Sequence, residues 1–218
     1  MPASKRARVV SLTKTDKKGR DQKNLLVERI RQIVPNYETI YVFRVSNMRN
    51  VLIKDLRKDW NDSVFLFGRN KVIQYALGPT PESEIADNVC HLAKVIEGDC
   101  GLLFTNRSHE EVVNFFENFE VPEYARAGFI PTEEFVIPEG PLENFSHTQE
   151  PFLRSLGLPT EMKNGVVHCR CPFTVSSPGV ALTPEKANLL KQFGVKLASF
   201  KVHIFAKWSK GEFLRFDE

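Results

Sequence analysis

The chain has few cysteines and no long apolar segment. Its 218 residues include only four cysteines, Cys90, Cys100, Cys169 and Cys171, at irregular spacing. A set this sparse is not typical of a disulfide framework, so a reducing compartment is expected. No apolar run approaches the roughly 20 residues that cross a bilayer, and no apolar stretch follows the basic N-terminus as in a secretory signal. These absences predict no membrane partner and a location in the nucleus or cytosol.

Motifs of nucleotide binding and hydrolysis are also missing. The segment Gly68-Arg69-Asn70-Lys71 follows an apolar run, as a phosphate loop does, but it has one glycine where a P-loop or dinucleotide fingerprint needs several. No Gly-x-Ser-x-Gly nucleophile motif is present. The sequence therefore predicts no catalytic residue, no cofactor and no enzymatic activity, and it disfavours the alternative of a nucleotide-dependent enzyme.

One cluster of soft ligands remains as a candidate metal site. His168-Cys169-Arg170-Cys171 places a histidine and two cysteines within four residues. In an extended strand Cys169 and Cys171 share one face, whereas His168 points to the other. A structural zinc site commonly draws on two ligand pairs, and the sequence offers no second pair. Packing cysteines are therefore favoured over a metal site.

Positive charge is concentrated in the first 24 residues. The formal net charge is +3, but residues 1–24 alone carry +6 and the remainder −3. A mildly acidic body with a basic arm suggests a polyanionic partner. A solvated tail or a nuclear-import signal is the alternative, and one segment can serve both purposes. The basic residues of this segment are Lys5, Arg6, Arg8, Lys14, Lys17, Lys18, Arg20 and Lys23.

Apolar runs alternate with segments of helical periodicity in the first half of the chain. Helices are expected from Asp21 to about Val34, over residues 49–60, after Gly68, from Thr80-Pro81-Glu82 to about Glu97, and after the capping box at Ser108. Buried strands are expected at residues 40–45, 64–67 and 101–105. This alternation predicts an α/β fold with a three-layer α/β domain, although the order of its strands cannot be read.

Proline and acidic residues set the segment after residue 120 apart. Nine of the thirteen prolines fall between Pro122 and Pro184. Short strands at 135–137 and 166–168 and one helix after Pro151 predict a small β-rich α+β domain. Residues 198–204 alternate as in a half-buried strand of the first domain, so the small domain would be an insertion. The expected divisions are a basic arm at 1–20, a discontinuous rRNA-binding α/β domain at 21–119 and 183–218, and an inserted second domain at 120–182.

Basic residues also gather in one part of the first domain. Over residues 25–81 they exceed acidic residues by nine to five, whereas over residues 82–118 the balance reverses to two against eight. Asn70 is a good candidate N-cap for a helix whose free N–H groups would face a phosphate. Besides the arm residues, the expected RNA contacts are Arg44, Asn47, Arg49, Lys54, Arg57, Lys58, Arg69, Asn70 and Lys71.

Several motifs resemble a family of ribosome assembly factors that are paralogues of the ribosomal stalk-base protein P-zero. The motifs run in order along nearly the whole chain, at residues 11–15, 17–19, 47–50, 67–72, 101–107, 124–128, 156–160 and 182–185. The segment Tyr124-Ala125-Arg126-Ala127-Gly128 and the turn at Gly68 are similar to P-zero itself. The resemblance implies a discontinuous domain that binds large-subunit rRNA at the stalk base, in the GTPase-associated region, and carries an inserted second domain.

The resemblance also implies partners and a role. The sequence ends at Glu218 without the stalk-recruiting helices and acidic tail of P-zero, which implies a placeholder on the pre-ribosomal large subunit (60S) that P-zero later replaces. A phosphatase-like release factor and neighbouring ribosomal proteins are the implied partners of a monomer within the particle. Nucleus and nucleolus are implied, with shuttling to the cytoplasm. The alternative is a protein-interaction scaffold in pre-ribosomes, whose basic arm is only an import signal.

Overall fold

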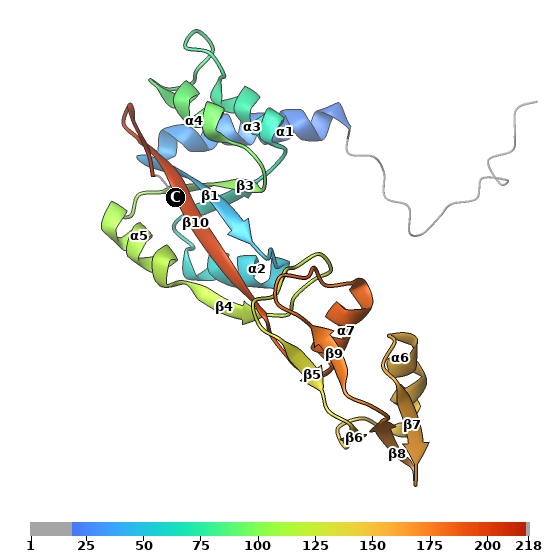
Figure 1. The fold of residues 1–218 in the computed structure, drawn as a ribbon. Coiled ribbons are helices and arrows are strands. Elements are labelled where there is room, and N and C mark those ends of the chain that lie inside the picture. Colours follow the sequence, from blue (N-terminus) through green and yellow to red (C-terminus); the bar gives the residue numbers. More distant parts are fainter. Residues whose placement is uncertain (1–18, 217–218) are drawn as a thin grey trace, which may run out of the picture.

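The computed structural model describes residues 19–216 of the chain. The arm residues Lys5, Arg6, Arg8, Lys14, Lys17 and Lys18 lie outside this range, so the expectation for them stays a prediction. Figure 1 shows an α/β domain at one end of an elongated molecule and a smaller, β-rich part at the other. None of the described helices is both long enough and apolar enough to cross a membrane.

An antiparallel sheet forms the centre of the α/β domain. Its strands are β1 (Thr39–Ser46), β2 (Val64–Phe67), β3 (Cys100–Thr105), β10 (Ala198–Ser209) and β11 (Glu212–Arg215). They are arranged in the order β11-β10-β1-β3-β2, and β4 (Glu120–Glu123) pairs with the start of β10. Strand β10 therefore completes the sheet of the first domain beside β1, as the alternation in residues 198–204 predicted.

Helices cover both faces of this sheet. Helices α1 (Arg20–Ile33), α3 (Asn70–Leu77) and α4 (Val89–Val95) share one core with Ile40 and Val42 of β1. Helices α2 (Asn50–Asp59) and α5 (His109–Asn118) share the other with Tyr41 and Phe43. Successive residues of a strand point to opposite faces, so β1 contributes to both cores. The expected three-layer α/β domain is confirmed.

The helix expected from Thr80 to about Glu97 is wrong in its first half. Helix α4 begins only at Val89, and residues 80–88 form turns. Gly78 has φ of +93°, and a Cβ there would lie 2.3 Å from the carbonyl oxygen of Ser83. The chain thus folds back on Gly78. The carboxylate of Glu84 then accepts hydrogen bonds from the backbone N–H groups of Asn88 and Cys90 at the start of α4.

The inserted part is built from short strands and two helices. It contains β5 (Phe135–Ile137), β6 (Gly140–Pro141), α6 (Glu150–Ser155), β7 (Thr160–Lys163), β8 (Val166–Cys169), β9 (Phe173–Ser176) and α7 (Pro184–Gln192). The leucines Leu189 and Leu190 of α7 pack in the same core as Leu153, Val167 and Val175. Helix α7 therefore belongs with the insertion, which continues past the expected boundary at residue 182. Two 3-10 turns, η2 (Val34–Asn36) and η3 (His147–Gln149), complete the described elements.

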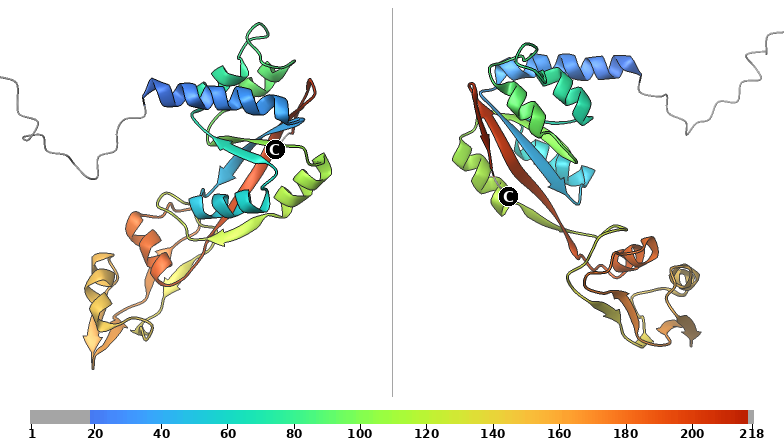
Figure 2. Two further views of the ribbon diagram at one scale, coloured as in Figure 1. Left: turned by 180° about the vertical axis from the view of Figure 1, so that it is seen from behind. Right: turned by 45° about the horizontal axis from the view of Figure 1, so that its top comes forward.

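A narrow neck joins the two parts of the molecule. It consists of β4 paired with the first residues of β10, with Glu120 opposite Lys201 and Glu123 opposite Ala198. The Lys201 ammonium lies 2.8 Å from the Glu120 carboxylate. Figure 2 shows β10 running from this neck across the whole sheet of the α/β domain. A single strand of 12 residues thus belongs to both the neck and the sheet.

Candidate nucleic-acid interface

The outer edge of β2 carries a basic hollow. Strand β2 ends the sheet, and a hollow of about 350 Å³ beside it is lined by Arg29 of α1, Arg57 of α2 and residues 63–67. An Nη2 of Arg57 donates a hydrogen bond of 3.0 Å to the carbonyl oxygen of Phe65, and its guanidinium lies 5.8 Å from the centroid of the Phe67 ring. A charged side chain placed on an edge strand discourages pairing with another strand. It also brings a cation to this open border.

The turn after β2 adds two further cations to the same border. Arg69 and Lys71 are exposed at the first turn of α3, directly after Phe67 and Gly68. A Cβ on Gly68 would lie 2.7 Å from a methyl group of Leu26, so the turn packs tightly against α1. We call Arg29, Arg57, Arg69 and Lys71 the basic edge. It draws on three helices that lie on two sides of the sheet.

Asn70 does not cap α3 as the sequence analysis expected. It is the first residue of the helix, and Arg69 occupies the N-cap position without a capping hydrogen bond. The Asn70 side-chain amide instead donates to the carbonyl oxygen of Gly98 at 2.7 Å. The expectation of a side-chain cap is wrong, but its consequence for binding is strengthened. The first N–H groups of α3 have no side-chain acceptor and the positive end of the helix dipole faces Arg69 and Lys71.

The predicted basic face of α2 is exposed. Lys54, Arg57 and Lys58 all lie on the surface, at the spacing that places side chains on one side of a helix. Lys58 is paired with Asp55 of the same helix at 3.1 Å. Both groups are more than half exposed, so a phosphate can compete for the lysine at little cost. Arg20 is also exposed, as the first residue of α1.

Three other expected RNA contacts are engaged within the protein. Arg44 lies with its guanidinium 4.7 Å from the centroid of the Phe205 ring, above the sheet. Asn47, with φ of +53°, donates from its side-chain amide to the carbonyl oxygen of Ser199 at 2.8 Å. Arg49 donates to the carbonyl oxygen of Tyr124 and lies 3.7 Å from the Glu123 carboxylate. Asn47 and Arg49 thus hold β1 and α2 to the neck, away from the basic edge.

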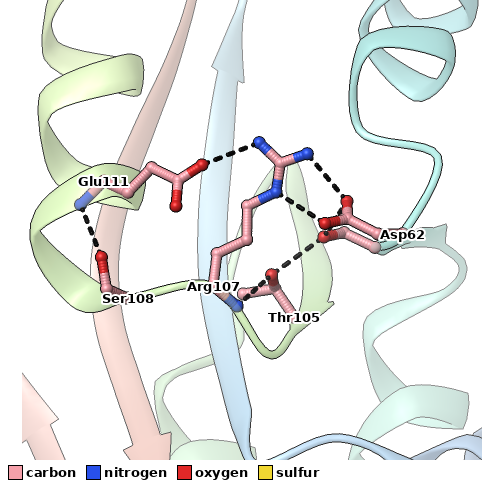
Figure 3. Close-up of polar contacts among 6 residues, drawn as sticks. Asp62, Thr105, Arg107, Ser108 and Glu111 are labelled. Carbon is pink, nitrogen blue, oxygen red and sulfur yellow. Dashed lines mark hydrogen bonds and ion pairs between the residues drawn. The ribbon is translucent and has the colours of Figure 1, made fainter.

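A second arginine that a family motif contains, Arg107, is also structural. Its Nε and Nη2 donate to both carboxylate oxygens of Asp62 at 2.8 and 2.9 Å, and its Nη1 lies 3.0 Å from Glu111 (Figure 3). The guanidinium carbon lies 4.2 Å from the centroid of the Trp60 ring. These hydrogen bonds lower the pKa of Asp62. The group ties the loop before β2 to the start of α5.

The cysteine cluster has a packing role in the described part of the chain. Cys169 is buried, and its thiol donates to the carbonyl oxygen of Cys171. Burial raises the pKa of this thiol, which disfavours the thiolate that binds metals. Among residues 19–216 no three histidine, cysteine or acidic side chains are grouped closely enough to hold a metal ion.

Arg29 is the basic-edge residue that the sequence analysis missed. It sits one residue before Ile30, which is fully buried, on the flank of α1 that faces β2. Helical spacing around Ile30 was the available signal, because flanking residues on an amphipathic helix border the buried stripe. The position of β2 beside that flank was not available from the sequence.

Comparison with known protein families matches both parts of the molecule. Residues 18–121 match the family model described as ribosomal protein L10, and residues 125–195 match the model of the insertion domain found in 60S ribosomal proteins of the L10 family. The second range ends beyond α7, in agreement with the packing of that helix. The α/β domain, its neck and its insertion therefore define a protein with the architecture of ribosomal protein L10.

Individual relatives narrow this class. A protein of Dictyostelium discoideum named ribosome assembly factor mrt4 is 42% identical over 218 residues, which cover 100% of this chain and 98% of that protein. The Saccharomyces cerevisiae protein of the same name is 33% identical over 94% of this chain and 93% of its own length. The chain belongs to this family of ribosome assembly factors. A large ribosomal subunit protein uL10 of Thermococcus sibiricus is 25% identical over 85% of this chain and 55% of that protein.

Proposed function

We propose that the protein binds large-subunit rRNA at the stalk base, within the GTPase-associated region, as a placeholder that the stalk protein P-zero later replaces. The observation that carries the proposal is the basic edge, where four exposed cations from three helices border the end of β2. Matches to ribosomal protein L10 and uL10 relatives support the same site, since related RNA-binding domains compete for related RNA.

Backbone phosphates are the proposed ligands of the basic residues. Arg57 and Arg69 offer guanidinium groups suited to bidentate phosphate binding, and the uncapped first turn of α3 offers N–H groups with a favourable dipole. The exposed residues Lys54, Lys58, Lys71 and Arg20 extend this surface. The arm residues before Gly19 would add contacts, in keeping with their charge. Selectivity would come from RNA shape, because the deep groove of A-form RNA excludes side chains.

Exchange on the particle completes the proposal. The protein acts by occupancy and carries out no chemical step, and it is a monomer within the pre-ribosomal large subunit, beside neighbouring ribosomal proteins. A phosphatase-like release factor assists its replacement. The protein works in the nucleolus and nucleus and leaves with the particle for the cytoplasm. The acidic bias of the insertion makes that part a candidate protein-facing surface, since eight acidic and four basic residues fall within 119–182.

Salt dependence of binding to a stalk-base rRNA fragment tests the electrostatic proposal. If about six phosphates are neutralised, the logarithm of the affinity should fall with the logarithm of salt concentration at a slope near −4 to −5. Titrations between 50 and 200 mM salt measure this slope. A flat response, or no binding to the naked fragment, would favour the alternative of a protein-interaction scaffold with an import signal.

A further inference from the structure

Tyr75 presents a large aromatic ring to solvent on the outer side of α3. Its side chain is 64% exposed, whereas Ile73, Ala76 and Leu77 of the same helix are buried in the core. Lys71 lies one turn earlier, and residues four apart share a face of a helix. Tyr75 therefore stands next to one of the cations of the basic edge.

A second cation reaches Tyr75 from the neighbouring helix. The guanidinium carbon of Arg31 in α1 lies 5.9 Å from the centroid of the Tyr75 ring. Helices α1 and α3 pack side by side on the same face of the sheet (Figure 1). The exposed ring is thus flanked by Arg31 and Lys71. An aromatic surface between two cations suits a ligand with a flat π-system and phosphates on either side.

We infer that Tyr75 stacks on an unpaired base of the bound rRNA, while Arg31 and Lys71 bind the flanking phosphates. The inference rests on the proposed rRNA-binding function and adds the chemical feature that the site selects, a base that is not paired within a duplex. RNA-binding proteins read loops and bulges by stacking such bases on aromatic side chains. Exposed tyrosines also occur in protein interfaces, but lysine is depleted from the centres of those interfaces.

Removing the ring without changing charge isolates the stacking contact. Tyr75→Ala should weaken binding to a stalk-base rRNA fragment with its natural loops by about ten-fold, within the range found for base–aromatic stacking. Tyr75→Phe keeps the ring and should bind like the unchanged protein. The salt slope should be the same in all three proteins, because no phosphate contact is lost. Phe152→Ala is the matched control, since Phe152 is a 45% exposed aromatic in the insertion.

A second probe distinguishes a base from a duplex. A fully paired RNA of the same length should bind Tyr75→Ala and the unchanged protein equally. Equal affinity of the two proteins for the natural fragment would overturn the stacking inference and leave the proposed function standing. A Tyr75→Ala variant that binds the fragment normally but is lost from pre-ribosomal particles would assign Tyr75 to a protein contact and also overturn it. Absence of binding by the unchanged protein would overturn both.

Discussion

Arg69 and Lys71 are two cations at the positive end of a helix, a position that disfavours positive charge by about 0.3–1 kcal/mol each. A bound phosphate removes this penalty. The double variant Arg69→Glu and Lys71→Glu should therefore fold at least as well as the unchanged protein. It should bind stalk-base rRNA at least ten-fold more weakly, and its salt slope should be shallower by roughly 1.5 because two phosphate contacts are lost. Thermal unfolding and salt titration measure the two effects.

A charge reversal far from the basic edge serves as the control. Lys191→Glu changes an exposed residue of α7 in the insertion and should leave rRNA affinity nearly unchanged. Equal weakening by both variants would show that net charge alone governs binding. Unchanged affinity in the double variant would remove the turn after β2 from the interface.

Single residues show where sequence reasoning succeeds for the site. Exposure of Lys54, Arg57 and Lys58 follows from helical spacing alone, and the structure agrees. The partners of Arg49 lie about 75 positions away in and beside β4, and that of Asn47 lies 152 positions away in β10. No local pattern signals such long-range hydrogen bonds, so these two side chains looked like free polar groups in the sequence.

At the scale of elements, the pair Asp62 and Arg107 fastens the loop before β2 to the start of α5. Hydrogen bonds from Arg107 hold the pKa of Asp62 below its usual value of 3.8. The ionised carboxylate therefore adds stability at pH values above 3.8, and this contribution is lost as the pH falls through the lowered pKa. Asp62→Asn should reduce stability at pH 7 by about 0.5–1 kcal/mol, and its unfolding temperature should approach that of the unchanged protein once the pH lies below the lowered pKa.

A double-mutant cycle supplies the control for this pH dependence. Asp62→Asn, Arg107→Ala and the double variant give a coupling free energy that should be present at pH 7 and should disappear as the carboxylate is protonated. A coupling that is the same at neutral and acid pH would show that the carboxylate charge contributes nothing. The stacking of Arg107 on Trp60 should remain in Asp62→Asn, which keeps the loss of stability small.

Elements were predictable where a pattern ran without interruption. The apolar runs at β1, β2 and β3 and the alternation of β10 have one interpretation each, and all four strands formed as expected. The segment after Gly78 misled because Thr80-Pro81-Glu82 looks like a helix start, whereas packing of the chain against Gly78 forces turns there. Helix α7 was expected in the first domain because its sequence does not show which core receives its leucines.

For the molecule as a whole, Arg49 decides how firmly the insertion is attached. Arg49→Ala removes the hydrogen bond to Tyr124 and the contact with Glu123, and it should lower stability by about 1–2 kcal/mol. Hydrogen exchange should rise in β4 and the first residues of β10. The salt slope of rRNA binding should not change, because the side chain serves the neck.

The slope separates the two roles that Arg49 has been given. A slope shallower by roughly 0.7–0.9 would show a phosphate contact and restore the expectation from the sequence. Lys54→Ala is the matched control, since it removes an exposed cation of α2. It should lower the slope without raising exchange in the neck.

Strand β10 also sets the order in which the protein can be completed during its own synthesis. Its partner β1 ends at Ser46, but β10 is not made until residues 198–209 leave the translating ribosome. Until then the edge of β1 and both apolar faces of the sheet are incomplete, and pairing over such a separation forms slowly. A nascent chain therefore needs protection from aggregation. Only a fully translated chain can present the finished α/β domain to RNA.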